Sequence, residues 1–202
     1  MSDSGLFRDI TFFTSVAEET ALPPSLIEVA FAGRSNAGKS SAINALAQRH
    51  RLAFVSKTPG RTQQINFFSL GRERFLVDLP GYGYAKVPQG MRDEWEHLIS
   101  AYLQLRPQLR GLVVVMDIRH PMKPLDRQLL AWFAASAKPA HILLAKTDKL
   151  GRQQAVQQLR STESILARQF PRVSVQLFSA HSKIGIEEAH RVLAQWYGNA
   201  AT

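Results

Sequence analysis

The amino-acid sequence predicts an α/β fold: a mostly parallel six-stranded sheet with one antiparallel edge strand and helices on both faces. An apolar run at residues 27–32 leads through a glycine-rich loop into a helical pattern. A second run, at 112–117, is almost continuously apolar, which is typical of a parallel strand covered on both faces. The length of 202 residues, with 45% of them hydrophobic, suits one domain with a sizeable core.

Charge sets the composition apart, because 25 Lys and Arg residues stand against 16 Asp and Glu residues, a formal net charge of +9. A strongly basic domain favours a polyanionic partner such as nucleic acid, although the charge could serve solubility alone. Cysteine is absent, which excludes disulfides and zinc–thiolate sites. The start of the chain lacks a targeting pattern, and no run approaches the roughly 20 apolar residues of a membrane span. We therefore expect a cytoplasmic protein that does not bind membranes.

In chain order, residues 1–25 form an N-terminal extension that we expect to pack on a domain at 26–198. Residues 10–13 of this extension could add an edge strand or a packing arm. The first strand of the domain then occupies 27–32, and its first helix occupies 41–47.

Between that strand and helix, residues 33–40 match the phosphate-binding loop pattern G-x-x-x-x-G-K-[ST] at every fixed position. The glycines let backbone N–H groups converge on a phosphate, and the helix aims its positive end at the same anion. Lys39 supplies a cation for the β- and γ-phosphates, and the hydroxyl of Ser40 is the expected magnesium ligand. The alternative is a glycine-rich turn that binds nothing.

A long polar loop follows at residues 48–64 and carries Thr58 and Thr62. Either hydroxyl could reach a magnesium ion, and Thr62 is favoured because it lies nearer the next strand; the alternative is an ordinary Pro-Gly surface turn. Runs at 65–70 and 74–77 then predict an antiparallel hairpin. Its second strand leads into Asp78 and Gly81. These residues suit a carboxylate beside the magnesium site and a backbone N–H that meets a γ-phosphate.

The remaining chain alternates helices and strands. Two tyrosines, Tyr82 and Tyr84, either touch a partner or pack beneath their loop, and His120 is predicted to be structural rather than a metal ligand or a base. Helices are expected at residues 91–105, 125–135, 156–170 and 185–197, and strands at 112–117, 140–145 and 173–178.

The strand at 140–145 ends at Lys146 and Asp148. A carboxylate there can accept two hydrogen bonds from the N1–H and 2-amino groups of guanine, and adenine offers no matching pair of donors. The stem of Lys146 can lie over the base. After the last strand, Ser179 and Ala180 could present a backbone N–H to guanine O6.

The stretches at residues 33–41, 58–63, 78–85 and 117–121 look like those of the EngB family of bacterial ribosome-assembly GTPases. The resemblance covers nearly the whole chain from residue 27 onward. It implies a Ras-like P-loop GTPase fold, binding of GTP or GDP with Mg²⁺, and slow hydrolysis of GTP. It also implies a role in maturing the large (50S) ribosomal subunit, and more loosely a role in cell division and septation.

The resemblance also implies a set of site residues. Those that act in catalysis are Lys39, Thr62 and Gly81, and those that bind the metal are Ser40 and Thr62. Those that bind the nucleotide are Gly33, Arg34, Ser35, Asn36, Ala37, Gly38, Lys39, Ser40, Ser41, Gly60, Arg61, Thr62, Gln63, Gln64, Asp78, Leu79, Pro80, Gly81, Ala145, Lys146, Thr147, Asp148, Phe178, Ser179 and Ala180.

Four positions depart from the general GTPase pattern or qualify it. Ala145 stands where most GTPases have Asn, which removes a side-chain link between the base loop and the phosphate loop and should weaken nucleotide binding. His181 replaces a lysine whose stem packs on the base. Tyr82 replaces a water-positioning glutamine, so intrinsic hydrolysis should be slow. Related GTPases use an Asn at the position of Asn36 to hold K⁺, which could substitute for an arginine finger.

The interpretation that fits these features is a monomeric molecular switch. GTP and magnesium would order the loops at 58–62 and 78–85, and hydrolysis would release them. The ordered surface, with Arg61, Lys86 and Arg119, would bind ribosomal RNA on the large-subunit precursor through phosphate contacts. Two alternatives stay open: an ATP-dependent phosphotransferase, and an RNA-binding assembly factor that holds nucleotide with little turnover.

Overall fold

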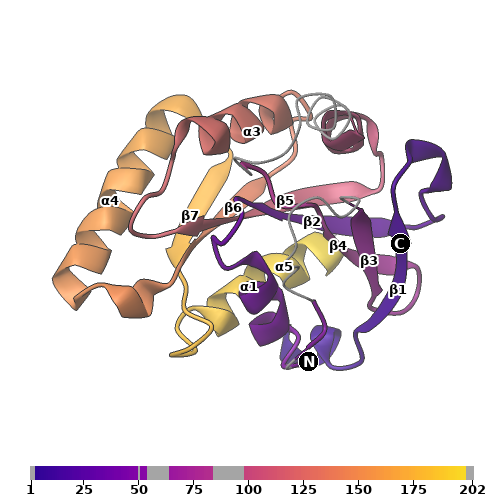
Figure 1. Ribbon diagram of the computed structural model, residues 1–202, viewed down its shortest axis with the longest axis horizontal. Coiled ribbons are helices and arrows are strands. Elements are labelled where there is room, and N and C mark those ends of the chain that lie inside the picture. Colours follow the sequence, from indigo (N-terminus) through magenta and orange to yellow (C-terminus); the bar gives the residue numbers. More distant parts are fainter. Residues whose placement is uncertain (1–2, 50, 54–63, 84–97, 199–202) are drawn as a thin grey trace.

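A seven-stranded sheet runs through the centre of the computed structural model, which describes residues 3–49, 51–53, 64–83 and 98–198 (Figure 1). The strand order is β1-β3-β4-β2-β5-β6-β7. The strands are β1 (Thr11–Val16), β2 (Ile27–Gly33), β3 (Ile65–Ser69), β4 (Arg74–Asp78), β5 (Leu109–Asp117), β6 (Ala140–Ala145) and β7 (Val173–Leu177).

The sheet confirms the predicted α/β class but has one strand more than predicted. Neighbouring strands from β4 through β7 are parallel, whereas β3 is antiparallel to both β1 and β4. The additional strand is β1, which forms the edge beside β3, so the antiparallel strand lies second from the edge. The sequence of residues 10–13 is compatible with an edge strand or a packing arm. The pairing of β1 with β3, which is distant in the sequence, shows that the segment adds an edge strand.

Helices cover both faces of the sheet. The α-helices that lie wholly within the described residues are α1 (Lys39–Leu46), α3 (Pro124–Ala134), α4 (Arg152–Gln169) and α5 (Ile186–Gly198). Short 3₁₀ helices are η1 (Asp3–Phe7), η2 (Glu19–Ala21) and η3 (Thr147–Lys149). Of the helix expected at 91–105, residues 98–105 are described and are helical. Among the described helices, none is both long enough and apolar enough to cross a bilayer.

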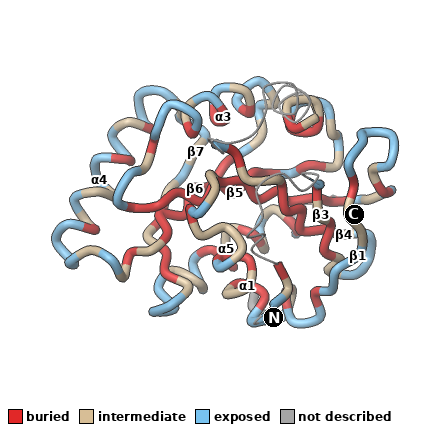
Figure 2. Tube along the Cα trace, in the orientation of Figure 1, coloured by how far each residue is buried: buried red, intermediate tan, exposed pale blue. Residues whose placement is uncertain are grey.

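Alternation along β2 divides the core into two layers. Val29 and Phe31 pack with α1 and α5 on one face, while Ala30 and Ala32 pack with α3, α4 and the helix at 98–105 on the other. All of β2 is buried, and buried residues follow the central strands in Figure 2. This pattern is expected for a parallel strand that is covered on both sides.

The parallel strands end at one edge of the sheet. In the strand register Phe31 pairs with Asp78, and Asp117 pairs with Ala145. The loops that follow β2, β4, β5 and β6 therefore leave the sheet side by side. Ligands of open α/β sheets bind at this carboxyl edge, so the fold places the candidate site there.

The N-terminal helix η1 packs against α5. Phe7 is 1% exposed, and its ring stacks on His190 at a centroid distance of 5.0 Å and meets Tyr197 edge-on at 6.3 Å. His190 Nε2 lies 2.9 Å from the carbonyl oxygen of Leu46, the last residue of α1. The side chain of Phe7 therefore packs on α5, whose His190 in turn contacts the end of α1.

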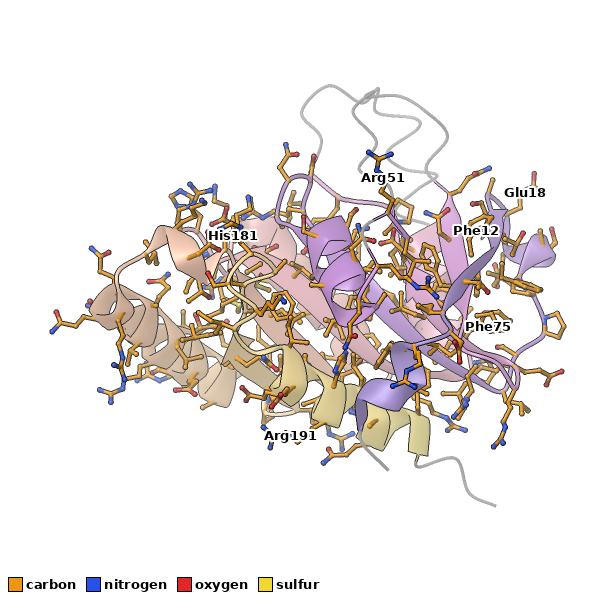
Figure 3. The ribbon with its side chains drawn as sticks, turned by 90° about the horizontal axis from the view of Figure 1, so that it is seen from below. Phe12, Glu18, Arg51, Phe75, His181 and Arg191 are labelled. Atoms are coloured by element: carbon orange, nitrogen blue, oxygen red, sulfur yellow. The ribbon has the colours of Figure 1, made fainter. Side chains whose placement is uncertain are left out.

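Replacing Phe7 with alanine should lower the free energy of unfolding by about 3 kcal/mol, because the change empties a buried aromatic site. The matched control is Phe12→Ala in β1, because Phe12 is 55% exposed and lies at the edge of the molecule (Figure 3). That control should cost less than about 1 kcal/mol. Urea unfolding of both variants measures the difference, and equal losses would contradict the packing described for Phe7.

Candidate functional site

The phosphate-loop motif has the predicted surroundings, because β2 ends at Gly33 and α1 begins at Lys39. Gly38 is the N-cap residue, with φ 108° and ψ 15°. The first backbone hydrogen bond of the helix runs from the Ala42 N–H to the Gly38 carbonyl oxygen at 2.8 Å. The preceding N–H groups lie at the helix N-terminus and have no acceptor within the helix. The turn therefore presents several donors, and the positive end of the helix dipole, to one point.

Two glycines in this turn are needed for different reasons. A Cβ at Gly33 would lie 2.8 Å from the carbonyl oxygen of Val115 on β5, so the close packing of two strands excludes a side chain. Gly38 needs its positive φ, a conformation that costs other residues energy. Together the glycines leave an open cradle of backbone donors, which fits a phosphate group.

Lys39 and Asp78 meet at the centre of the site. Lys39 Nζ forms an ion pair with Asp78 Oδ1, and both side chains are largely buried. Asp78 is the last residue of β4, where the Leu79 N–H donates to the Phe31 carbonyl oxygen at 2.9 Å. Parallel pairing of β4 with β2 thus brings the carboxylate next to the lysine of the phosphate loop.

The loop after Asp78 continues along the phosphate loop. The Tyr82 N–H donates to the Gly33 carbonyl oxygen at 3.3 Å, and the Ser35 N–H donates to the Tyr82 carbonyl oxygen at 2.9 Å. Gly81 lies between Asp78 and this contact. The Asp-x-x-Gly segment and the phosphate loop, predicted to share a site, therefore lie against each other. Tyr82 is 5% exposed, so of the two predicted roles, contact with a partner or packing beneath the loop, the structure shows packing.

A lysine links the loop after β6 to the phosphate loop. Lys146 Nζ donates to the Asn36 carbonyl oxygen at 2.6 Å and pairs with Asp117 Oδ2 at 3.0 Å. Ala145 was expected to remove the side-chain link between these two loops. The structure places a different link there, because Lys146 adopts φ 63° and its side chain spans the gap. The methyl group of Ala145 instead packs toward Gly38.

Asp117, the last residue of β5, holds this lysine. Arg119 donates to both of its carboxylate oxygens, from Nε at 2.9 Å and from Nη2 at 2.7 Å. These hydrogen bonds, with a smaller contribution from Lys146, hold the pKa of the Asp117 carboxyl well below its usual range, although burial opposes the shift. Asp117 therefore stays ionised and forms ion pairs with both Arg119 and Lys146.

The loops after β6 and β7 are joined by side chains. The Ser179 hydroxyl donates to Asp148 Oδ1 at 2.6 Å, and Lys149 Nζ lies 3.2 Å from Asp148 Oδ2. The hydrogen bond from Ser179 lowers the pKa of the Asp148 carboxyl. Thr147 is buried, with Oγ1 at 2.9 Å from the Phe178 carbonyl oxygen. The two predicted base-binding segments thus form one unit, in which Thr147 supports the backbone.

A buried polar network holds the rest of the loop after β7. Gln176 Nε2 donates to the Gly185 carbonyl oxygen at 2.7 Å, and Gln176 Oε1 lies 2.8 Å from His141 Nε2. Gly185 has φ 76°, and a Cβ there would overlap the Leu177 carbonyl oxygen. His181 is exposed on this loop (Figure 3). Nothing in the local sequence marks Gln176 or His141, because their roles depend on contacts between neighbouring strands.

The contacts described above join the phosphate loop to the segment after β4 and to the loop after β6, which in turn contacts the loop after β7. Ser40 is half-buried and Ser41 exposed in the first turn of α1, and Gln64 is exposed before β3. Arg119, predicted as an RNA contact, is engaged by Asp117, a residue to which no role was assigned. Seven positions named from the sequence lie outside the described residues: Thr58, Gly60, Arg61, Thr62, Gln63, Tyr84 and Lys86.

Comparison with known proteins places the chain in a family. The model of a family described as "50S ribosome-binding GTPase" matches residues 28–146. The protein named "Probable GTP-binding protein EngB" from Thiobacillus denitrificans is 60% identical over 185 residues, which cover 92% of this chain and 89% of that protein. Its counterpart from Methylobacillus flagellatus is 58% identical over 192 residues, or 95% of this chain and 93% of that protein. The chain belongs to the EngB family of GTP-binding proteins.

Solved structures agree on the fold. A structure titled as a probable GTP-binding protein engB has a TM-score of 0.65 at 20% identity and covers 84% of this chain and 97% of that one. Era in complex with MgGDPNP and a segment of 16S ribosomal RNA also has a TM-score of 0.65, at 19% identity, over 86% of this chain and 57% of that one. This chain therefore has the Ras-like P-loop GTPase fold that the resemblance implied.

Asp117→Asn should lower the free energy of unfolding by about 1 kcal/mol at pH 7, after allowance for screening by solvent. Because the folded-state pKa of Asp117 is depressed, its contribution is present above the ordinary carboxyl pKa of about 4. It is lost as the pH falls below that value toward the folded-state pKa. The difference between the wild type and the variant should therefore shrink in acid.

Urea unfolding at pH 7 and near pH 3 measures this difference, with Glu163→Gln on the exposed side of α4 as the control. The control should change the free energy of unfolding by no more than about 0.5 kcal/mol at either pH. A loss for Asp117→Asn that is the same at both pH values would contradict the ion-pair account.

Proposed function

We propose that this EngB-family protein binds GTP and GDP with Mg²⁺, hydrolyses GTP slowly, and uses the GTP-bound form to bind the ribosome. The observation that carries the proposal is the convergence of three loops. The phosphate loop lies against the Asp-x-x-Gly segment on one side and is linked through Lys146 to Asp148 on the other. This arrangement supports a phosphate site at the phosphate loop and a base site at Asp148, linked by the hydrogen bond from Lys146 to the Asn36 carbonyl oxygen.

At the phosphates, the backbone N–H groups at the start of α1, residues 38–41, would surround the anion, and Lys39 would turn from Asp78 toward it. Ser40 and Thr62 would hold the magnesium ion, which neutralises charge that develops on the phosphates when it is bound. Asp78, released from the lysine, would bind water on that ion. The Gly81 N–H would donate to the γ-phosphate.

At the base, Asp148 would accept hydrogen bonds from the N1–H and 2-amino groups of guanine. Ser179 supports this role, because its hydroxyl donates a hydrogen bond to Asp148 Oδ1. That hydrogen bond lowers the pKa of the carboxyl and so favours its charged form. Phe178, Ser179 and Ala180 would present the backbone toward O6. Membership of a GTP-binding family favours guanine over the ATP-dependent alternative.

Hydrolysis would be slow because Tyr82 stands directly after Gly81, where a side chain could orient water. Its phenol is buried and donates its hydrogen bond to Asp126 instead. A potassium ion beside Asn36, which is exposed with φ 62°, would supply the missing positive charge. Equal turnover in sodium and in potassium would argue against that ion.

The partner that we propose is ribosomal RNA on the large-subunit precursor, which the protein would meet in the cytoplasm as a monomer. The net charge of +9 and the 16S ribosomal RNA bound to Era support ribosomal RNA as the partner, and the description of the matched family model supports the 50S subunit. Assistance in assembling the 50S subunit, and through it normal cell division and septation, would follow. Residues 26–198 would act as the GTPase domain and residues 1–25 as its packed extension.

Asp148→Asn should weaken GDP binding by about ten- to a hundredfold, because two hydrogen bonds to a charged acceptor are lost. Xanthine carries a carbonyl where guanine has its amino group, so the new amide should bind XDP more tightly than the wild type does. Titration of labelled GDP, XDP and ADP into both chains measures this exchange. Equal binding of GDP and ADP by the wild type would contradict guanine recognition.

Binding of large ribosomal subunits in the presence of a GTP analogue should weaken steeply as KCl rises, because phosphate contacts release counterions. Pelleting assays between about 50 and 200 mM salt should show a loss of at least about tenfold for several contacts. The same titration with GDP is the control and should give weaker binding throughout. Association that is unchanged across the salt range would count against an RNA interface.

A further inference from the structure

One buried carboxylate connects the phosphate loop with the loop that follows Gly81. Asp126, in the first turn of α3, is fully buried. Its Oδ1 accepts a hydrogen bond from the Tyr82 hydroxyl at 2.8 Å and one from Arg34 Nε at 3.3 Å. Its Oδ2 accepts from the Lys123 N–H at 3.0 Å, which anchors it to the start of the helix. We call these side chains, Arg34, Tyr82 and Asp126, the Asp126 cluster.

Each member of the Asp126 cluster belongs to a different part of the site. Arg34 is the first residue after Gly33 in the phosphate loop, and its Nη2 also donates to the His120 carbonyl oxygen at 3.0 Å. Tyr82 follows Gly81 directly. Burial, followed by the charge and hydrogen bond of Asp126, raises the pKa of the Tyr82 phenol, so it stays a neutral donor. Asp126 therefore accepts from both loops at once.

The backbone contacts show what this clamping does. The Tyr82 main chain bonds with Gly33 and Ser35 on either side of Arg34, as in a short parallel bridge. Gly83 then turns away with φ 80°, and a Cβ there would press on Leu125 at 3.2 Å. The phenol and the main chain of Tyr82 are thus fixed on two sides, which leaves the peptide at Gly81 little freedom.

We infer that Asp126 is a positioning residue: through Tyr82 and Arg34 it holds the Gly81 peptide against the phosphate loop and thereby favours binding of GTP over GDP. The inference rests on the proposed function, in which the Gly81 N–H meets the γ-phosphate. GDP lacks that phosphate and so makes no use of the contact. A donor that is already in place binds its acceptor more tightly than one that must first be ordered.

The structure offers a matched control at the opposite end of β2. The Tyr102 hydroxyl donates to Glu28 Oε2 at 2.8 Å, and Arg106 pairs with Glu28 Oε1 at 2.6 Å. Tyr102 and Glu28 are fully buried, as Asp126 is. This second cluster has the same chemistry, phenol and guanidinium on one carboxylate, but it lies at the start of β2 rather than at its end.

The test compares Tyr82→Phe with Tyr102→Phe, each of which removes one buried hydroxyl and keeps the ring. The Kd values of GDP and of a non-hydrolysable GTP analogue are measured with Mg²⁺, together with the melting temperature. Tyr82→Phe should raise the Kd of the analogue about three- to tenfold and change that of GDP by less than about twofold. Tyr102→Phe should lower the melting temperature and leave the ratio of the two Kd values unchanged.

Arg34→Gln releases the other loop from the same carboxylate and keeps the test valid if Tyr82→Phe folds poorly. Arg34→Gln should shift the ratio of the two Kd values in the same direction as Tyr82→Phe. The variant with both substitutions should shift this ratio by less than the two single shifts combined, because both residues act through Asp126. Normal binding by the wild type with an unchanged ratio in both variants would overturn the inference alone. An equal shift in Tyr102→Phe would also overturn it. A wild type that binds neither nucleotide would overturn the proposed function itself.

Discussion

Parallel pairing of β2 with β4 on one side and β5 on the other places the phosphate loop beside Asp78 and Asp117. The pairing is tight, because Gly33 leaves no room for a Cβ beside the Val115 carbonyl. It aligns the end of β2 with Asp78 and, one strand further, the end of β5 with Ala145. Loops that are far apart in sequence therefore start from one edge. The site is a consequence of strand register before any side chain contributes to it.

Side-chain links then fix the loops relative to one another. Lys146 joins the base loop to the Asn36 carbonyl, Asp126 joins the phosphate loop to Tyr82, and Ser179 joins Asp148 to the loop after β7. Each link ends on a group that is buried or otherwise held, so each loop loses freedom as the protein folds rather than as a ligand binds. A site ordered in this way pays less entropy on binding.

Local patterns predicted much of this arrangement. The phosphate loop was predictable because the spacing of its glycines and the lysine after them follow from the chemistry of one turn. Asp78 was predictable because it ends an apolar strand, and Asp148 because it follows one closely. The edge strand β1 was not decided by its sequence, since residues 10–13 have too short a pattern to choose between pairing and packing. Two contacts were not predictable: the hydrogen bond from Lys146 to the Asn36 carbonyl oxygen, and the hydrogen bond from Tyr82 to Asp126. Both join residues that are far apart in the sequence. Such contacts leave no periodic trace.

In the function proposed for this protein, four separated segments form one guanine-nucleotide site. Amide hydrogen exchange with and without GDP tests it most directly, because exchange reports each segment separately. The account predicts that protection rises together at residues 33–41, 78–82, 145–148 and 178–180 when GDP and Mg²⁺ are added, and that ADP has no such effect. Protection confined to the phosphate loop, or equal protection by ADP, would contradict it.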